Sequence, residues 1–179
     1  MAIMLNAFVP GASALQSPLI MPMLMLPSVP IHFAGHQTAY LLHQSEYFFP
    51  PLNLLCTLGN TLLTGIAFYY SRSASSGATA AVRQLAAAKA PKLMLAAALN
   101  IATTAWALVI QVPMNKRMTV LAGEMGKGVE RGEEKEPRQR QNELEFRGLQ
   151  SRWRKLNYGR AAIMISSAIA SGSALLAHA

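Results

Sequence analysis

Long apolar runs, separated by shorter polar stretches, extend through most of the chain. A helix needs about 20 mainly apolar residues to cross the hydrocarbon core of a bilayer. Three runs reach this length, near residues 51–71, 91–113 and 155–177, and a fourth, Pro-rich run lies near residues 5–28. The pattern therefore predicts an all-α protein, a four-helix transmembrane bundle with an irregular first helix.

Prolines mark the expected ends of these helices. Pro50 and Pro51 precede the second run, Pro91 stands at the first turn of the third, and Pro113 is expected to close it. A cleaved signal peptide is the alternative for the first run, but that run has no basic residue at its start. Five prolines interrupt the same run: Pro10, Pro18, Pro22, Pro27 and Pro30.

The charge distribution supports a membrane protein. Only 13% of the 179 residues are charged, against about 25% in a typical soluble domain. The net charge is +8, but no charged residue precedes Glu46, and the basic residues lie mainly between the apolar runs. This distribution is typical of membrane proteins and argues against nucleic-acid binding. The length allows a single domain over residues 1–179, and the lone Cys56 excludes an intramolecular disulfide.

A long charged connection joins the third and fourth predicted helices. Residues 113–155 hold eleven Lys or Arg and seven Glu. Mixed charge with Gly and Pro favours a mobile linker over residues 123–140. A helical stripe begins near Gln141 and is expected to run unbroken into the last span. The basic residues on either side of the spans are too evenly divided to set the membrane orientation.

Histidines form the first candidate site. If residues 31–49 are helical, His32, His36 and His43 share one face, with Glu46 nearby. Two His at this spacing could hold a metal with a carboxylate, although we expect no bound metal. His36 or His43 could instead act as a general base, and an ordinary interfacial segment rich in aromatic residues is the remaining interpretation.

A second candidate site lies where the charged connection meets the last helix. Trp153, Asn157 and Arg160 share a helical face, and Arg160 is the one charge inside the apolar stretch. Such a guanidinium either extends outward to the membrane surface or faces inward, where it could bind an oxyanion or a phenolate. Asn115 and Arg117, just after Pro113, could approach the same place.

Polar and small residues also occur at the predicted membrane depth. Asn60 and Asn100 could form hydrogen bonds between helices or line a cavity between them. Small residues spaced by four on the last helix would allow close helix packing: Ala162, Ser166, Ala170 and Ala174, with Ser167 and Ser171 beside them.

Three motifs carry a family resemblance. They read GASALQSPL in the stretch from Gly11 to Pro22, VPMNKRM from Val112 to Met118, and RWRKLNYGRA from Arg152 to Ala161. Together they resemble the DUF1772, or anthrone oxygenase-like, family of small four-helix membrane proteins, many of them fungal. Asn157 departs from the family pattern, in which a His is often seen there. The matching positions are Pro113, Asn115, Arg117, Trp153, Leu156, Asn157 and Arg160.

The resemblance implies a membrane monooxygenase that converts an anthrone-type aromatic polyketide to an anthraquinone in secondary metabolism. O₂ would be the co-substrate and no cofactor would be needed, because the anthrone anion is electron-rich enough to react with O₂. The expected catalytic residues are Arg160, Asn157, Asn115, His36 and His43, and the expected substrate-binding residues are Trp153, Arg117 and Asn100.

Two other functions remain open on the sequence alone. One is a non-catalytic membrane scaffold that anchors biosynthetic partners, and the other is a small transporter. For each, a multi-pass protein of the endoplasmic reticulum or another endomembrane is expected, in contact with membrane lipid. A homo-oligomer is compatible with the pattern but is not required by it.

Overall fold

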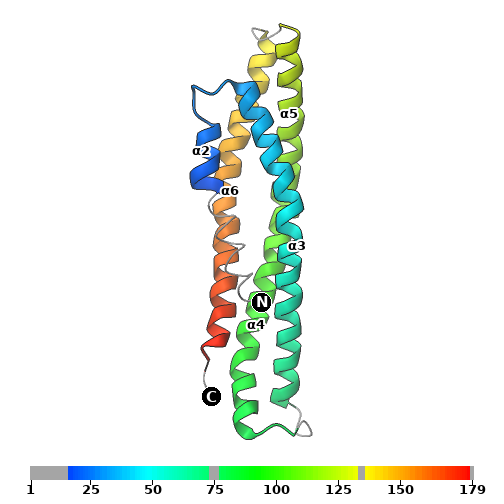
Figure 1. Cartoon of the computed structure of the whole chain (residues 1–179), viewed down its shortest axis with the longest axis vertical. Helices are drawn as coiled ribbons and strands as arrows, with labels where there is room; N and C mark the ends of the chain where they lie inside the picture. Colours follow the sequence, from blue (N-terminus) through cyan, green and yellow to red (C-terminus); the bar gives the residue numbers. More distant parts are fainter. Residues whose placement is uncertain (1–15, 73–76, 133–135, 178–179) are drawn as a thin grey trace. The chain divides into compact units, whose positions relative to one another are not determined.

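The computed structural model describes residues 16–72, 77–132 and 136–177. These ranges contain helices and no strand, which confirms the all-α prediction (Figure 1). The elements in chain order are η1 (Gln16–Ile20), α2 (Met21–Leu24), α3 (Ile31–Arg72), α4 (Ala80–Trp106), η2 (Ala107–Gln111), α5 (Val112–Glu130) and α6 (Pro137–Leu175).

The described residues divide into two compact units. The apolar unit holds residues 49–72, 77–105 and 161–177, and the polar unit holds residues 16–48, 106–132 and 136–160. All eight acidic residues of the sequence fall outside the apolar unit, which contains four basic residues. The prediction of one domain over the whole chain is not tested by this division.

The prolines do not end the helices as predicted. Ala80–Glu130 is one helical run made of α4, η2 and α5, so Pro91 and Pro113 both lie inside it. Proline lacks the N–H and clashes with the carbonyl four residues earlier. Directly before Pro113, the wide π-helical turn η2 relieves this clash locally, as such turns do in membrane helices.

The same holds for α3, which contains Pro50 and Pro51. The sequence predicted an interfacial helix and a separate span at 51–71, but the structure joins them into one helix of 42 residues. Such a helix is about 63 Å long at 1.5 Å per residue, twice what a bilayer core of about 30 Å requires. At the N-terminal side, the described part of the predicted first span ends as a helix at Leu24.

The apolar unit packs parts of α3, α4 and α6 through small and polar side chains. On α6, Ser167 and Ser171 are buried, and so are Ala170 and Ala174 of the predicted row. Ala162 and Ser166, the first two residues of that row, are exposed. Ser167 Oγ donates to Asn100 Oδ1 over 2.8 Å, and Ser171 Oγ donates to Asn60 Oδ1 over 3.1 Å. The close apolar contacts are made by Ala67, Ala90, Leu93 and Ala174.

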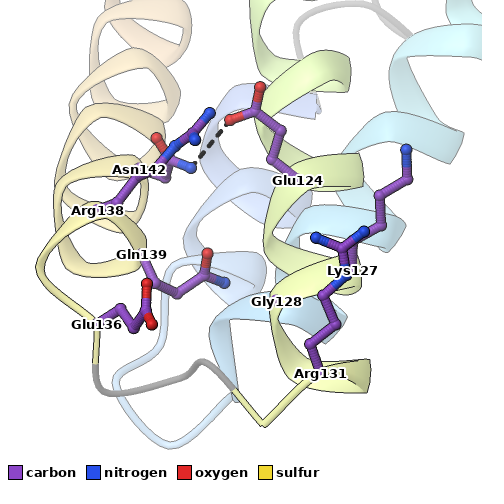
Figure 2. A pocket seen from close by; sticks show the side chains of 8 residues that line it. All are labelled: Glu124, Lys127, Gly128, Arg131, Glu136, Arg138, Gln139 and Asn142. Atoms are coloured by element: carbon purple, nitrogen blue, oxygen red, sulfur yellow. Dashed lines mark hydrogen bonds between the residues drawn. The ribbon is translucent and has the colours of Figure 1, made fainter.

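The predicted mobile linker at 123–140 is wrong at both ends. Helix α5 continues to Glu130, and α6 begins at Pro137, so the expected charged loop is largely a helical hairpin. Gln139 is buried, and its Nε2 donates to the carbonyl of Met125 over 3.0 Å. Figure 2 shows this side chain extending from α6 toward the part of α5 that holds Gly128.

Much of the predicted linker is helical because α5 carries a stripe of apolar residues, which the charged residues around it make hard to recognise. Positions 114, 118, 121 and 125 of α5 carry Met or Leu at helical spacing, and all four are buried. They pack against Phe146 and Trp153 of α6 and Leu42 of α3 in the core of the polar unit. Burial of this stripe requires both helices, and therefore orders residues whose composition alone favours a linker.

Two helical stretches are long and apolar enough to cross a membrane. They are α3 and the run Ala80–Glu130, and they contain the predicted spans 51–71 and 91–113. Large apolar side chains such as Leu54, Leu58 and Leu62 are exposed along α3, as expected for a helix that faces lipid. The remaining two spans of the predicted four-helix transmembrane bundle stay predictions.

Candidate functional site

An open groove lies between α3 and α5 within the polar unit. It has a volume of ≈ 780 Å³, within the range of small-molecule sites. Apolar side chains line one part of it, and the rest carries groups that can exchange protons or hold charge. The lining residues are His36, Ala39, Tyr40, Leu42, His43, Glu46, Lys116, Thr119 and Val120.

The two predicted histidine bases both line this groove. The His36 ring lies over Gly126 of α5, where a Cβ would be 3.0 Å from Nε2. The His43 ring meets Tyr47 edge-on, with ring centroids 4.9 Å apart. Within the described ranges, no three His, Cys, Asp or Glu side chains come close enough to hold a metal ion. The geometry thus places His36 and His43 at a cavity, and neither ring has an orienting hydrogen bond to the part of the chain that the structure describes.

Glu46 is the one groove residue held by a buried hydrogen-bond chain. Trp153 Nε1 donates to Asn115 Oδ1 over 3.0 Å, and Asn115 Nδ2 donates to Glu46 Oε1 over 3.0 Å. Trp153 and Asn115 are buried, whereas Glu46 is exposed at the groove. Since an indole can only donate and a carboxylate can only accept, the Asn115 carboxamide has one favourable orientation. Trp153 and Asn115 thus fix the position of one carboxylate oxygen of Glu46.

Arg160 is buried rather than extended toward the surface. Only 8% of the residue is exposed, and its Nη1 donates to Gln111 Oε1 over 2.8 Å. Gln111 Nε2 then donates to Asn157 Oδ1 over 3.2 Å, and Asn157 Nδ2 donates to Ser17 Oγ over 2.8 Å. These four side chains form a buried network that connects α6 with η2 and η1.

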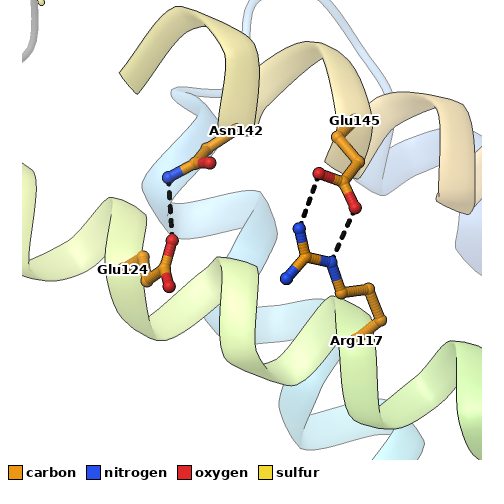
Figure 3. A network of polar contacts seen from close by, with 4 residues as sticks. All are labelled: Arg117, Glu124, Asn142 and Glu145. Atoms are coloured by element: carbon orange, nitrogen blue, oxygen red, sulfur yellow. Dashed lines mark hydrogen bonds and ion pairs between the residues drawn. The ribbon is translucent and has the colours of Figure 1, made fainter. Parts of the chain in front are cut away.

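Arg117 lies outside both the groove and the buried network. Its Nε and Nη2 donate to the two carboxylate oxygens of Glu145 over 2.6 and 2.7 Å (Figure 3). A second contact between α5 and α6 joins Asn142 Nδ2 to Glu124 Oε2. The hydrogen bonds from Arg117 lower the pKa of Glu145, and those to Glu145 raise the pKa of Arg117. Both side chains are exposed, so the pair holds the hairpin surface.

The structure therefore divides the predicted site residues among four places. His36 and His43 line the groove, while Asn115 and Trp153 support it through Glu46. Asn157 and Arg160 belong to the buried network, and Arg117 belongs to the hairpin surface. The remaining residue, Asn100, lies in the apolar unit, where its backbone carbonyl and side chain bind Asn53 and Ser167.

Sequence reasoning missed Gln111 and Ser17, and considered Glu46 only as a metal ligand. Gln111 lies four residues before Asn115, on the same helical face, so its spacing was an available signal. Ser17 lies inside the first family motif, yet nothing in the sequence indicated that it would bind Asn157. The structure brings parts of all three motifs together in the polar unit.

Comparison with known protein families identifies a match over most of the chain. A family model described as anthrone oxygenase matches residues 39–170, which is well over half of the chain. The matched range includes all of the groove except His36, the Glu46 chain, and all of the buried network except Ser17. No curated protein and no solved structure matches the chain.

Proposed function

Because the chain belongs to the anthrone oxygenase family, we propose that it is a membrane oxygenase that oxidises an anthrone-type polyketide with O₂. The observation that carries this proposal is the groove between α3 and α5. It combines proton acceptors, a cation and an aromatic ring with apolar side chains in a single cavity. These are the groups that proton removal from a flat phenolic substrate requires.

The lining of the groove supports a flat polycyclic substrate. A volume of ≈ 780 Å³ accommodates a polycyclic molecule. Tyr40 offers an aromatic surface for stacking, and Leu42 and Val120 offer apolar contact. Lys116 supplies a positive charge for a phenolate oxygen. We propose Lys116 rather than Arg160 as the cation that faces the substrate, because Lys116 lines the groove and Arg160 does not.

The reaction needs only a base, O₂ and stabilisation of the anion. The base removes one proton from the central methylene carbon, and the remaining electron pair is delocalised as an aromatic phenolate. This carbon forms a bond to O₂, which is reduced to a peroxide that takes a proton to become a hydroperoxide. Removal of the second methylene proton breaks the O–O bond and leaves a ketone and water. One oxygen atom enters the quinone and the other enters water, without an added reductant.

The membrane setting suits this substrate. Hydrophobic anthrones partition into lipid, and α3 joins the groove residues to a stretch apolar enough to cross a bilayer in one continuous helix. We propose a multi-pass protein of an endomembrane, where O₂ is also more soluble than in water. In this setting a bound substrate displaces water from the apolar side of the groove and strengthens its contacts with the charged groups.

Co-expression with an anthrone-producing synthase tests the function. We expect a higher ratio of quinone to anthrone than in an empty-vector control, which is needed because anthrones also oxidise slowly without an enzyme. With labelled dioxygen, the new ketone should carry one labelled oxygen atom. A ratio equal to that of the vector control, with the protein present in the membrane, would refute the oxygenase and favour a non-catalytic scaffold.

A further inference from the structure

We infer that Glu46, rather than a histidine, is the catalytic residue that removes the methylene proton of the substrate. This inference rests on the proposed function and assigns the base within the same groove. Three groove residues carry a side chain that can serve as a general base: His36, His43 and Glu46. The hydrogen bonds that hold each of them distinguish the three.

A general base must be held in one geometry relative to the proton that it removes. Glu46 Oε1 is fixed by Asn115, and no other described residue binds the carboxylate. Its second oxygen therefore keeps its acceptor capacity at the groove. His36 is placed by contact with Gly126, and His43 by contact with Tyr47, and neither ring has a hydrogen-bond partner among the described residues.

The hydrogen bonds from Trp153 to Asn115 and from Asn115 to Glu46 both point toward the carboxylate. A donor-only indole on α6 turns the carbonyl of Asn115 toward itself, which turns the amide N–H groups of Asn115 toward α3. An N–H group in that position holds one oxygen of the Glu46 carboxylate in a fixed place. Asn115 and Trp153 are therefore positioning residues that align Glu46.

Carboxylates remove carbon-bound protons beside carbonyl groups in other enzymes. Here the proton goes from the methylene carbon to Glu46, and the electron pair remains on the substrate as the phenolate. Lys116, which lines the same groove, lies on the neighbouring helix as a counter-charge for that phenolate. Glu46 then returns this proton to the peroxide, removes the second methylene proton as the O–O bond breaks, and passes that proton to the departing hydroxide to form water, so it ends the cycle as a carboxylate.

Proton exchange without O₂ isolates this step. The purified protein is incubated anaerobically in heavy water with a hydroxylated anthrone, and deuterium at the methylene carbon is followed by mass spectrometry. We expect wild-type protein to accelerate exchange over buffer, and Glu46→Gln to lower the protein-catalysed rate by about 10²-fold or more. The substituted amide keeps a carbonyl that can accept from Asn115, so the helix packing should be retained. Glu46→Asp should restore part of the rate.

Three further variants test the positioning, the specificity and the rival base. Trp153→Phe keeps an aromatic side chain but removes the N–H, and should lower kcat for oxidation with little change in KM. Glu145→Gln, an exposed carboxylate outside the groove, is the matched control and should exchange at the wild-type rate. Wild-type exchange in Glu46→Gln, or its loss in His43→Asn with Glu46 intact, would overturn the assignment. Wild-type protein that exchanges but does not oxidise would refute the proposed oxygenase while still testing Glu46.

Discussion

Gly128→Ala should destabilise the polar unit, although the same change elsewhere in α5 should stabilise it. A Cβ at Gly128 would lie 2.8 Å from three atoms of the buried Gln139 carboxamide. Gln139 would have to move, and its hydrogen bond to the Met125 carbonyl would weaken. At Gly123, a Cβ would meet nothing within 4 Å. The two glycines lie on one helix, but Gln139 packs over Gly128 and no side chain of the described residues packs over Gly123.

The magnitudes follow from three effects. Replacing Gly by Ala in a helix gains about 1 kcal/mol at either position. At Gly128, overpacking costs about 1–3 kcal/mol and the lost hydrogen bond about 0.5–1.5 kcal/mol. Gly128→Ala should therefore lower the free energy of unfolding by about 0.5–3.5 kcal/mol, whereas Gly123→Ala should raise it by up to about 1 kcal/mol.

Chemical denaturation of the purified protein in detergent, followed by Trp fluorescence, measures both variants against wild type. Trp153 lies in the core of the polar unit and so reports on this region. A mobile linker at 123–140, as the composition predicted, would make the two substitutions equally silent. Equal stabilities for Gly128→Ala and Gly123→Ala would therefore refute the packed hairpin.

Two other predictions concern charged residues of the polar unit. Arg160→Ala should lower the free energy of unfolding by about 1–3 kcal/mol, because buried Gln111 loses a donor, while exposed Lys155→Ala should change it by less than about 0.5 kcal/mol. Turnover per folded molecule should change little; a fall of about 10²-fold would make Arg160 the oxyanion donor that the sequence predicted. Because Arg117 lowers the pKa of Glu145, the pair should stabilise the fold at neutral pH and lose this effect as the pH falls below about 4.3, the ordinary glutamate pKa. Stability curves of wild type and Glu145→Gln should therefore converge in acid, and a gap that widens there would contradict the ion pair.

The helical class and the apolar runs could be predicted from the sequence, but the helix ends could not. Pro91 and Pro113 were expected to mark boundaries because proline cannot donate the hydrogen bond of a helix interior. The structure keeps the helix through both, with a π-helical turn before Pro113. A π-helical turn of this kind cannot be predicted from composition, because it forms in response to the steric clash of the proline ring with the preceding turn.

The prediction of a mobile linker over residues 123–140 was wrong for a different reason. Composition averages over a window, and the window 123–140 is rich in Glu, Lys, Arg and Gly. The stripe that contains Met118, Leu121 and Met125 occupies one face of α5, so it is diluted in any average and visible only as a period. The spacing of these apolar residues, unlike the composition, predicts a helix that continues past Pro113 and packs against α6.

In the candidate site, the spacing of residues predicts which side chains share a helical face, but not which side chains of the other helix they contact. Trp153 and Arg160 are seven residues apart on one face of α6, and Gln111 and Asn115 are four apart on the facing helix. The two helices run in opposite directions, so Trp153 meets Asn115 and Arg160 meets Gln111. In each pair a donor-only side chain fixes the orientation of an amide, which then donates to an acceptor beyond it: Glu46 in one case and Asn157 in the other. A shift of either helix by one turn would break both chains at once. The pairs Arg160–Gln111 and Trp153–Asn115 thus fix the register of the hairpin, and the second pair also orients the carboxylate of Glu46 at the groove. Neither chain could be assigned from the sequence, because each depends on partners that lie on the other helix.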